Sequence, residues 1–220
     1  MAAITWDEAA KRFFEYGVSK GVFYTPNVSG VYTNGEAWNG LINITDNPTG
    51  ADNNKLWADG IEYANLRAAE QYGCSIECYT YPDGFAICDG IAQPVDGLFF
   101  HGQARKPFGL CWRTEIGNAL NSEFGYKLHI AYGLTVSPSE QAHDTVNENP
   151  DAGTFSWDAE ATPVAVTGFK PVAKIEIDSR KFTAEQMAAV EAVLYGSESA
   201  EARLPLPAEL QTLMAPAAGG

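Results

Sequence analysis

The sequence has little positive charge and no long apolar run. Its 220 residues carry 14 lysines and arginines against 28 aspartates and glutamates, a formal net charge of -14. Proteins that bind DNA or RNA neutralise phosphates with basic side chains, so this surface excludes ordinary nucleic-acid binding and disfavours anionic membranes. No stretch reaches the roughly 18 apolar residues of a transmembrane helix, and the opening MAAITWDEAAKRFFEYG has no signal-peptide core. We therefore expect synthesis in a cytoplasm and no membrane partner.

Cysteine is scarce, with four residues in the chain: Cys74, Cys78, Cys88 and Cys111. The first two lie on one face of one expected strand, too far apart along it for an easy mutual bridge. Thiols stay reduced in a cytoplasm, so we expect free, buried cysteines, with two disulfides as the alternative. A zinc site built from three of these cysteines and a histidine would match no usual ligand spacing.

Common catalytic motifs are also missing. The chain contains no GxSxG, P-loop, HExxH or CxxC sequence, and no GxGxxG that leads into a helix. Its histidines, His101, His129 and His143, are scattered without metal-ligand spacing. A carboxylate pair such as Glu62 and Glu77 could be drawn as a glycosidase acid and base, but 28 acidic residues produce such pairs by chance. We expect no enzyme activity, no cofactor and no metal.

What the sequence does contain is enough apolar material for a core, with 45% hydrophobic and 12% aromatic residues. Period-two alternation predicts strands in CSIECYT, FGLCWRTEIG and AKIEIDS. The strongest run, YKLHIAYGLTV, predicts that Tyr126 to Val136 presents apolar side chains on one face without a break, with His129 on the polar reverse. Asn34-Gly35 is a hairpin signal. Many strands and few helices favour a mainly β fold, an antiparallel sandwich or barrel with a flanking α-helix.

Two helices are expected. Thr183 and Gln186 form a capping box in front of an apolar stripe, which predicts a helix at about 184–195. Thr5 and Glu8 have the same spacing and predict a short helix from Thr5 to Tyr16. We divide the chain into an N-terminal arm (1–20), a β domain (21–199) and an extended, Pro- and Ala-rich C-terminal arm (200–220).

Two long polar segments interrupt the strands, Asp46 to Asp59 and Ser137 to Gly153. Loops longer than about 12–15 residues are uncommon in compact domains and are usually functional or disordered. The first one contains Leu56 and Trp57, which are apolar in an otherwise polar segment. A loop that is unnecessary inside a monomer makes sense if a neighbouring molecule buries it, and a floppy surface loop is the alternative.

An ordered set of segments resembles the major tail proteins of long, flexible-tailed bacteriophages. These segments are TWDEAAKRFFEYGVSKGVFY, AWNGLINITDNPTGADNNKLWADGIEYANL, IECYTYPDGFAICDG, QARKPFGLCWRTEIGN, GYKLHIAYGLTVSPSEQAHDTVNENPDAGTFSWDAEATPVAVTG and RLPLPAEL. The similarity runs from about Thr5 to Leu210. It implies a tail-tube-like β-sandwich with a flanking helix, six copies to a ring, and rings stacked into a hollow tube that conducts the genome.

The resemblance also implies roles for particular residues. The loop that reaches the next ring would use Asp46, Asn53, Asn54, Leu56, Trp57 and Asp59. Acidic side chains should line the lumen so that DNA slides without sticking, and the candidates are Glu62, Glu77 and Glu115, although Arg113 shares a face with Glu115. The C-terminal arm would lie across a neighbouring subunit and hold the two together through Leu204, Pro205, Leu206 and Pro207.

The implied partners are further copies of this chain and other tail proteins, such as the tape measure, the distal hub and the terminator. DNA would pass through without specific binding, and the mature protein would reside in the virion tail. The rivals of the same structural class are the inner tube of an injection machine, a hub or a terminator. The rivals of another class are a weak carboxylate hydrolase and a glycan-binding β-sandwich that uses Trp157, Trp112 or Tyr79.

Overall fold

The computed structural model describes residues 4–143, 145 and 152–215. Mainly β structure with a large antiparallel sheet and flanking helices confirms the expected fold class. The helical elements are η1 (Ala9–Lys11), η2 (Asp83–Ile87), η3 (Ser179–Lys181), α1 (Ala184–Tyr195) and α2 (Pro207–Leu213).

The main sheet has eight strands, all paired antiparallel, in the order β2-β1-β11-β12-β13-β8-β3 with β14 also paired to β12. In that order they are β2 (Tyr32–Trp38), β1 (Phe13–Pro26), β11 (Phe108–Asn118), β12 (Gly125–Val136), β13 (Phe155–Ala161), β8 (Gly73–Cys78), β3 (Leu41–Asp46) and β14 (Lys174–Asp178). The smaller ribbons are β4 (Thr49–Gly50) with β7 (Glu70–Gln71), β5 (Asn53–Ala58) with β6 (Ile61–Arg67), and β9 (Ala92–Val95) with β10 (Leu98–Phe100).

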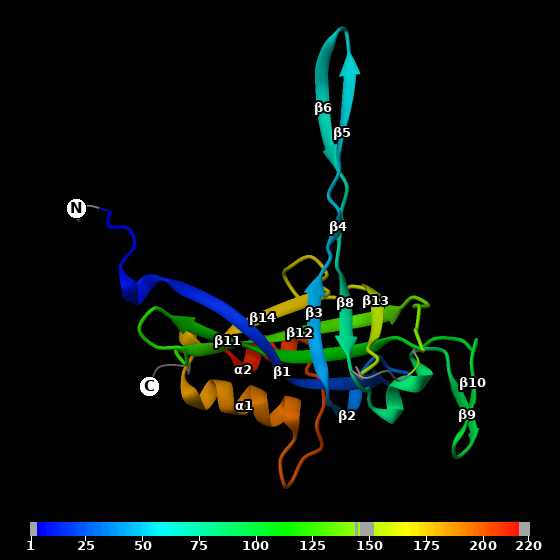
Figure 1. Cartoon of the computed structure of the whole chain (residues 1–220). Coiled ribbons are helices and arrows are strands. Elements are labelled where there is room, and N and C mark those ends of the chain that lie inside the picture. The colour runs from blue at the N-terminus through cyan, green and yellow to red at the C-terminus, as the bar shows by residue number, and fades with distance from the viewer. Residues whose placement is uncertain (1–3, 144, 146–151, 216–220) are drawn as a thin grey trace.

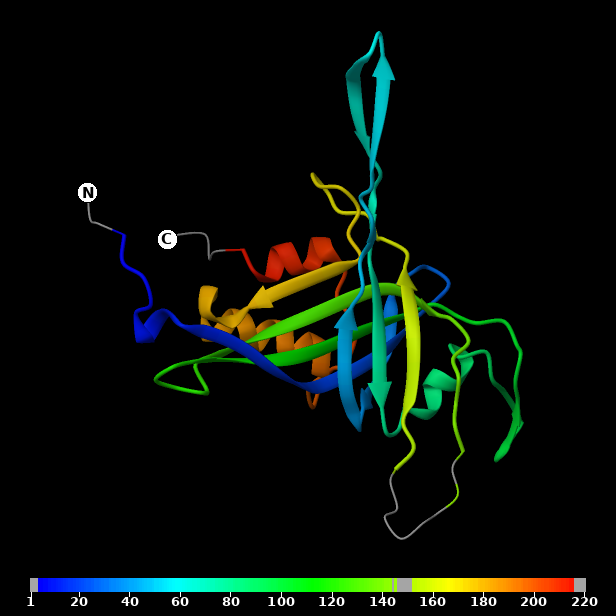
Figure 2. The same ribbon diagram turned by 45° about the horizontal axis from the view of Figure 1, so that its top comes forward.

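The main sheet folds over on itself. Strands β1, β11, β12 and β14, which we call the long sheet, run together across the molecule, and β3, β8 and β13, the short sheet, cross in front of them (Figure 1). Strand β12 connects the two, because its first half pairs with β14 and its last residues pair with β13. The helices lie behind the long sheet (Figure 2). The result is three layers, with the long sheet in the middle.

Each interface between layers has its own apolar core. Between the two sheets, aromatic rings from several strands surround Phe85 of η2, which is 0% exposed. This cluster includes Phe23, Trp38, Ile76, Phe108, Leu110, Trp112, Leu134 and Trp157. Between the long sheet and the helices lies a second cluster, which includes Tyr24, Cys111, Leu128, Ile130, Tyr132, Met187, Val190, Leu194, Leu204 and Leu210. The long sheet therefore buries apolar side chains on both of its faces, and this burial stabilises the fold.

The expected unbroken apolar face of β12 is wrong. Leu128 and Tyr132 pack towards the helices, whereas Leu134 and Val136 pack between the sheets. Between Tyr132 and Leu134, Gly133 has a φ of 60°. The pairs Phe108 with Leu134 and Leu110 with Ala131 are two residues apart on β11 but three residues apart on β12, so β12 contains one extra residue here. Such a bulge inserts one residue and reverses the alternation of every side chain beyond it.

The expected N-terminal helix from Thr5 to Tyr16 is also wrong. Only Ala9–Lys11 forms a short 3-10 turn, and β1 begins at Phe13. The Thr5 hydroxyl does contact the Glu8 carboxylate, but this contact caps no helix. Pairing with β11 along most of β1 satisfies many backbone groups at once, which outweighs a weak local helix signal. The expected domain boundary at residue 20 therefore falls inside a strand.

Turn positions differ from expectation as well. Asn34-Gly35 lies inside β2, and the β1–β2 turn is built at Asn27, whose side chain accepts two backbone hydrogen bonds. Trp38 ends β2, and β3 begins only after Gly40, which has a φ of 76°. Asx side chains and glycines favour turns in general, so the pattern alone does not show which of them the sheet uses.

Helix α1 confirms the predicted span, with the Thr183–Gln186 capping box formed in both directions. The extended C-terminal arm expected from residue 200 is not what the structure shows. Leu204 is 1% exposed and belongs to the core under the helices, and the Tyr132 hydroxyl donates to the Pro205 carbonyl at 2.8 Å. From Pro207 the chain forms α2, because proline is well suited to the first turn of a helix. Of the four expected arm residues, only Leu206 is exposed.

The prediction of free, buried cysteines is confirmed: all four side chains are unbridged and at most 1% exposed. Burial raises the pKa of the Cys74, Cys88 and Cys111 thiols to about 12 and also raises the pKa of Cys78. Buried thiols with raised pKa values are unreactive, so these residues serve as packing groups.

The bulge in β12 generates a first prediction. In Gly133→Ala the new Cβ would collide with the carbonyl oxygen of Thr162, in a backbone conformation that already disfavours a side chain. We expect the free energy of unfolding to fall by about 2 kcal/mol or more. Gly168 has a similar φ of 81° but open space around it, so Gly168→Ala should cost only about 1 kcal/mol. Equal losses in urea denaturation would contradict this account of the bulge.

Candidate functional site

The long sheet has two open edges. Strand β1 pairs with β11 from Phe13 onward but meets β2 only from Gly21, so its segment from Phe13 to Lys20 is hydrogen-bonded on one side. At the opposite side of the sheet, β14 pairs only with β12 among the described strands. Open edges bind extended chains through backbone hydrogen bonds.

The directions of these two edges are compatible with each other. Each step from β1 through β11 and β12 to β14 is antiparallel, so β1 and β14 run in opposite directions. The β14 edge of one copy can therefore add to the β1 edge of a second copy as an antiparallel pair, which continues the sheet. This contact joins two different surfaces, and repeated contacts of that kind generate rings or filaments.

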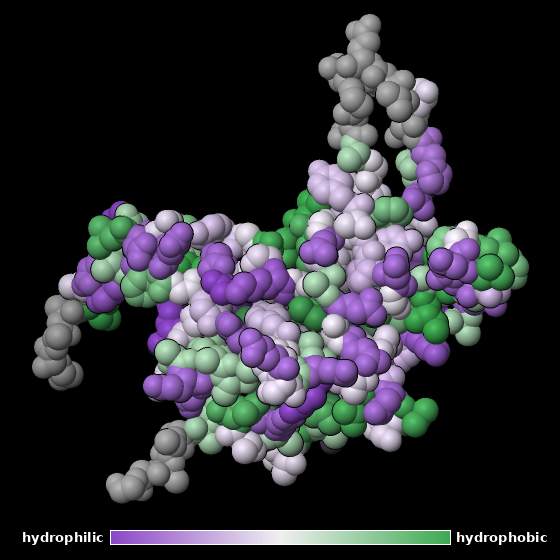
Figure 3. Space-filling model, turned by 90° about the horizontal axis from the view of Figure 1, so that it is seen from below, coloured by the Kyte–Doolittle hydropathy of each residue, from purple (hydrophilic) through white to green (hydrophobic). Residues whose placement is uncertain are grey.

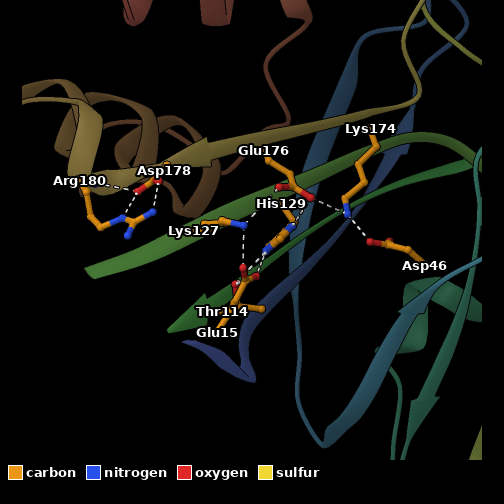
Figure 4. A network of polar contacts seen from close by, with 9 residues as sticks. All are labelled: Glu15, Asp46, Thr114, Lys127, His129, Lys174, Glu176, Asp178 and Arg180. Carbon is orange, nitrogen blue, oxygen red and sulfur yellow. Dashed lines mark hydrogen bonds and ion pairs between the residues drawn. The ribbon is translucent and has the colours of Figure 1, made fainter. Parts of the chain in front are cut away.

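The two faces of the long sheet differ in chemistry. One face is covered by the helices, and the other carries a polar network where the short sheet ends (Figure 4). The network contains Glu15, Asp46, Thr114, Lys127, His129, Lys174, Glu176, Asp178 and Arg180. These residues come from β1, β3, β11, β12, β14 and η3.

His129 lies at the centre of the network, with 6% of its side chain exposed. Its ring stacks on Trp112 at 5.1 Å between ring centroids. Its Nε2 atom lies 2.8 Å from Thr114 Oγ1 and 3.2 Å from Glu15 Oε1. Its Nδ1 atom lies 3.5 Å from Glu176 Oε1 and makes no hydrogen bond within the described residues.

Each cation of the network contacts a carboxylate. The pairs are Lys127 with Glu15 (2.6 Å), Lys174 with Glu176 (2.9 Å) and with Asp46, and Arg180 with Asp178 (2.6 Å). Asp46 ends β3 at the base of the β5–β6 ribbon, and Glu15 lies in the open part of β1. The network therefore connects the base of this ribbon to the open edge.

The surroundings set the charge states. Burial and the nearby Lys174 ammonium lower the pKa of His129, and the Glu176 and Glu15 carboxylates oppose that shift. Burial alone would raise the pKa of Glu15, but hydrogen bonds from Lys127 and Thr114 outweigh it and keep this pKa below 4.5. Burial is likewise outweighed at Glu176, by Lys174. The network at neutral pH thus combines a neutral imidazole with ionised carboxylates.

The segment from Asp46 to Asp59, expected to be an unstructured loop, is mostly a β-ribbon. Strands β5 and β6 extend far beyond the short sheet, with the β4–β7 pair beneath them (Figures 1 and 2). Asp59 and Gly60 form the turn, with φ values of 53° and 78°. An Asp-Gly pair between two strand-like runs is the signal for such a turn, and it was present in the sequence.

The β5–β6 ribbon has one apolar face. Opposed pairs on this face are Leu56 with Ala64 and Ala58 with Ile61, with Leu66 further down. Leu56, Ile61 and Leu66 are 41%, 63% and 54% exposed. A two-stranded hairpin is only marginally stable in water. Exposed apolar faces of this kind are typical of interaction surfaces.

Trp57 lies on the opposite face of the ribbon from Leu56, because successive side chains of a strand alternate. It shares that face with Lys55 and Glu62, which form an ion pair at 2.8 Å. The two expected anchors therefore cannot enter one apolar pocket side by side. Asn53 and Asn54 lie at the base of the ribbon, and Asp59 lies in its turn.

The three expected lumen residues do not come together. Glu62 lies on the projecting ribbon, and Glu77 lies on β8, on the side opposite the core residue Ile76. Glu115 lies on β11 and pairs with Arg113 of the same strand at 2.8 Å, not across strands. Sequence reasoning missed the polar network, although Lys127 and His129 stood out as the polar reverse of an apolar strand.

No protein-family model and no curated protein matches this chain. Within the described residues, no group of three or more His, Cys, Asp or Glu side chains is arranged to hold a metal ion. The described helices include none that is long and apolar enough to cross a membrane.

The network predicts a pH-dependent stability. Because the folded state lowers the pKa of His129, the unfolded chain binds more protons below about pH 6.5, and stability should fall as the pH drops below that value. Glu15 and Glu176, whose pKa values are lowered, add a further loss below pH 4.5. The measurement is the free energy of unfolding of the monomer, determined by denaturant titration at a series of pH values. In His129→Gln this free energy should fall less steeply as the pH drops below about 6.5. His101→Gln, at an exposed site, is the control. If the free energy of unfolding of His129→Gln depends on pH as that of the unsubstituted chain does, His129 is not the source of this pH dependence.

Proposed function

We propose that this chain is the tail-tube subunit of a long, flexible-tailed bacteriophage. Six copies join into a ring, the rings stack into a hollow tube, and the tube conducts the genome into the host. Its role is structural and not catalytic, and its site of residence is the virion tail. The proposal rests on the resemblance of the sequence segments and on one structural observation, the pair of open, oppositely directed edges on the long sheet.

The edges support ring formation for a geometric reason. Each copy contributes four antiparallel strands, so its β14 edge meets the next copy's β1 edge with the correct polarity. Closing the ring removes all open edges from the joined sheet, which is how barrels avoid aggregation. The helices cover one face of the long sheet, so they would lie on the outside of the ring. The other face, with the short sheet and the polar network beside it, would turn towards the channel.

The network gives the channel wall a property that DNA transport requires. Figure 4 contains four carboxylates and three permanent cations, and each cation already contacts a carboxylate. Lysines bind DNA by neutralising phosphates, and a paired lysine has less charge to offer. DNA would therefore slide because the wall's cations are internally neutralised, with the chain's net charge of -14 as a weaker general repulsion.

The β5–β6 ribbon is the element that would reach the next ring. It projects beyond the body of the subunit (Figure 1) and exposes an apolar face that its own chain leaves uncovered within the described residues. The C-terminal segment does not support the role expected for it, of holding two neighbouring subunits together, since it packs on its own helices. The N-terminal segment is the remaining arm, with Ile4 and Trp6 74% and 77% exposed.

Electron microscopy distinguishes the tail-tube proposal from the alternative functions of the same structural class. Long smooth tubes favour a tail-tube subunit, whereas single capped rings favour a hub or terminator. For a glycan-binding sandwich, Trp112 and Trp157 are each only 3% exposed and Tyr79 is 53% exposed. Binding of glycans in calorimetry, by a chain that stays monomeric at high concentration, would overturn the tail-tube proposal.

Proline substitutions test the β1 edge. Backbone N–H groups alternate sides along a strand, so only one of Phe13 and Phe14 directs its N–H away from β11. Phe13→Pro and Phe14→Pro form a matched pair, and the one with the outward N–H should keep the thermal stability of the monomer. We expect that variant to lose rings and tubes in negative-stain images. Normal tubes from both variants would count against the edge contact.

A shortened ribbon tests stacking. The Ala68 N–H donates to the Asp52 carbonyl at 3.0 Å, so an Asn-Gly turn can replace residues 53–67 without disturbing the base. The removed side chains are largely exposed, so monomer stability should change by less than about 0.5 kcal/mol. We expect rings that do not stack. Asp59→Asn, which keeps the turn conformation, should stack normally, and tubes of ordinary length from the shortened chain would contradict the role.

A further inference from the structure

A second hairpin, β9–β10, exposes apolar side chains that no sequence pattern had singled out. Leu98 pairs with Val95 and Phe100 pairs with Ala92, which places all four residues on one face. Val95, Leu98 and Phe100 are 64%, 47% and 52% exposed. Asp96 is the only charged residue between Ala92 and Phe100. The hairpin is a small apolar surface held away from the body of the protein.

This hairpin points in the opposite direction from the β5–β6 ribbon. In Figures 1 and 2 the ribbon rises from the top of the body, and β9–β10 lies at the right-hand side of the body and points downward. Figure 3 shows the molecule from below, and hydrophobic surface gathers at the right edge of this view, where β9–β10 lies. The remaining concentration of exposed aromatic residues, which includes Trp6, Phe13 and Phe14, lies to the side, around the open edge of β1.

We propose that the apolar face of β5–β6 in one copy docks on the apolar face of β9–β10 in a copy of the adjacent ring. This inference rests on the proposed tail-tube function and names the receiving surface for its stacking contact. Identical subunits that stack head to tail must bring the projecting end of one against the opposite end of another. The β9–β10 hairpin exposes an apolar face and points towards that opposite side (Figure 1).

Charge favours the same pairing. The chain carries a net charge of -14, so most surfaces of two copies repel. The β5–β6 ribbon is neutral, because Lys55 and Arg67 balance Asp59 and Glu62. Lys55, Glu62 and Arg67 lie on the face opposite the apolar one, because opposed residues share a face and Arg67 is paired with Asn53, so the apolar face carries no charged side chain. Two apolar faces with little opposing charge bury area without the desolvation cost of unpaired ions.

Paired cysteines test the contact directly. All four native thiols are buried, so Ile61→Cys and Leu98→Cys add the accessible ones. A chain that carries both, assembled and treated with a short bismaleimide, should give a ladder of covalent multimers, because each copy links to one above and one below. Either single variant should give no ladder. The matched control combines Ile61→Cys with Phe169→Cys, which is 71% exposed but lies on neither hairpin.

The readouts separate the two proposals. Electron microscopy of the same samples reports whether tubes form, and the gel reports the contact. A ladder in the Ile61/Leu98 pair supports the docking, and a ladder without tubes would support the docking while overturning the tail-tube function. No ladder beyond that of the Phe169 control, with or without tubes, overturns the docking.

A second measurement does not depend on added thiols. We expect Leu98→Ser to raise the protein concentration needed for tube assembly by about tenfold or more, since it removes one buried aliphatic side chain from every stacking contact. Phe169→Ser should leave that concentration unchanged. The two variants should unfold at the same denaturant concentration as monomers, since both side chains are exposed. Equal assembly by Leu98→Ser and the unsubstituted chain would overturn the docking.

Discussion

The open hydrogen-bonding edges of the long sheet, on β1 and β14, constrain the rest of the molecule. Soluble proteins usually keep edge strands short, bent or charged, because an open edge pairs with any extended chain. Here the β1 edge runs from Phe13 to Lys20 and carries aromatic side chains that are about half exposed. The faces of this sheet are covered by the helices on one side, and by the short sheet and the polar network on the other. The edges are what remains available for association.

The residues that stabilise the fold and the residues that expose apolar surface lie in different parts of the chain. The two apolar clusters contain the large buried side chains and hold the three layers together. The β5–β6 and β9–β10 hairpins expose most of their side chains and contribute little to that core. Hairpins of two strands are marginal alone and gain stability on contact. The three layers can therefore fold without support from the two hairpins.

The polar network shows how a strongly acidic chain accommodates lysines on one face of its long sheet, where each lysine contacts a carboxylate. Lys127 of β12 contacts Glu15 of β1, whereas Lys174 of β14 contacts Asp46 of β3 and Glu176 of its own strand. The neutral His129 ring lies between the two lysines (Figure 4). A chain of ion pairs, from Asp46 through Lys174, Glu176 and Lys127 to Glu15, joins the base of the β5–β6 ribbon to the open edge of β1. This connection depends on side chains that are more than one strand apart and reach across the sheet.

The sequence by itself determined the β-rich class, the free thiols and helix α1, because period-two alternation, the spacing of Cys74 and Cys78 along one strand and a capping box are local features. It also contained the Asp-Gly turn at Asp59, although the polar residues around it favoured a loop. Tertiary structure decided the rest. The local helix signal at Thr5 is outweighed by pairing with β11, and Leu204 to Pro207 fold inward because an apolar surface under the helices receives them. The network joins residues from position 15 to position 180, and no local pattern determines which distant side chains share one face of a sheet.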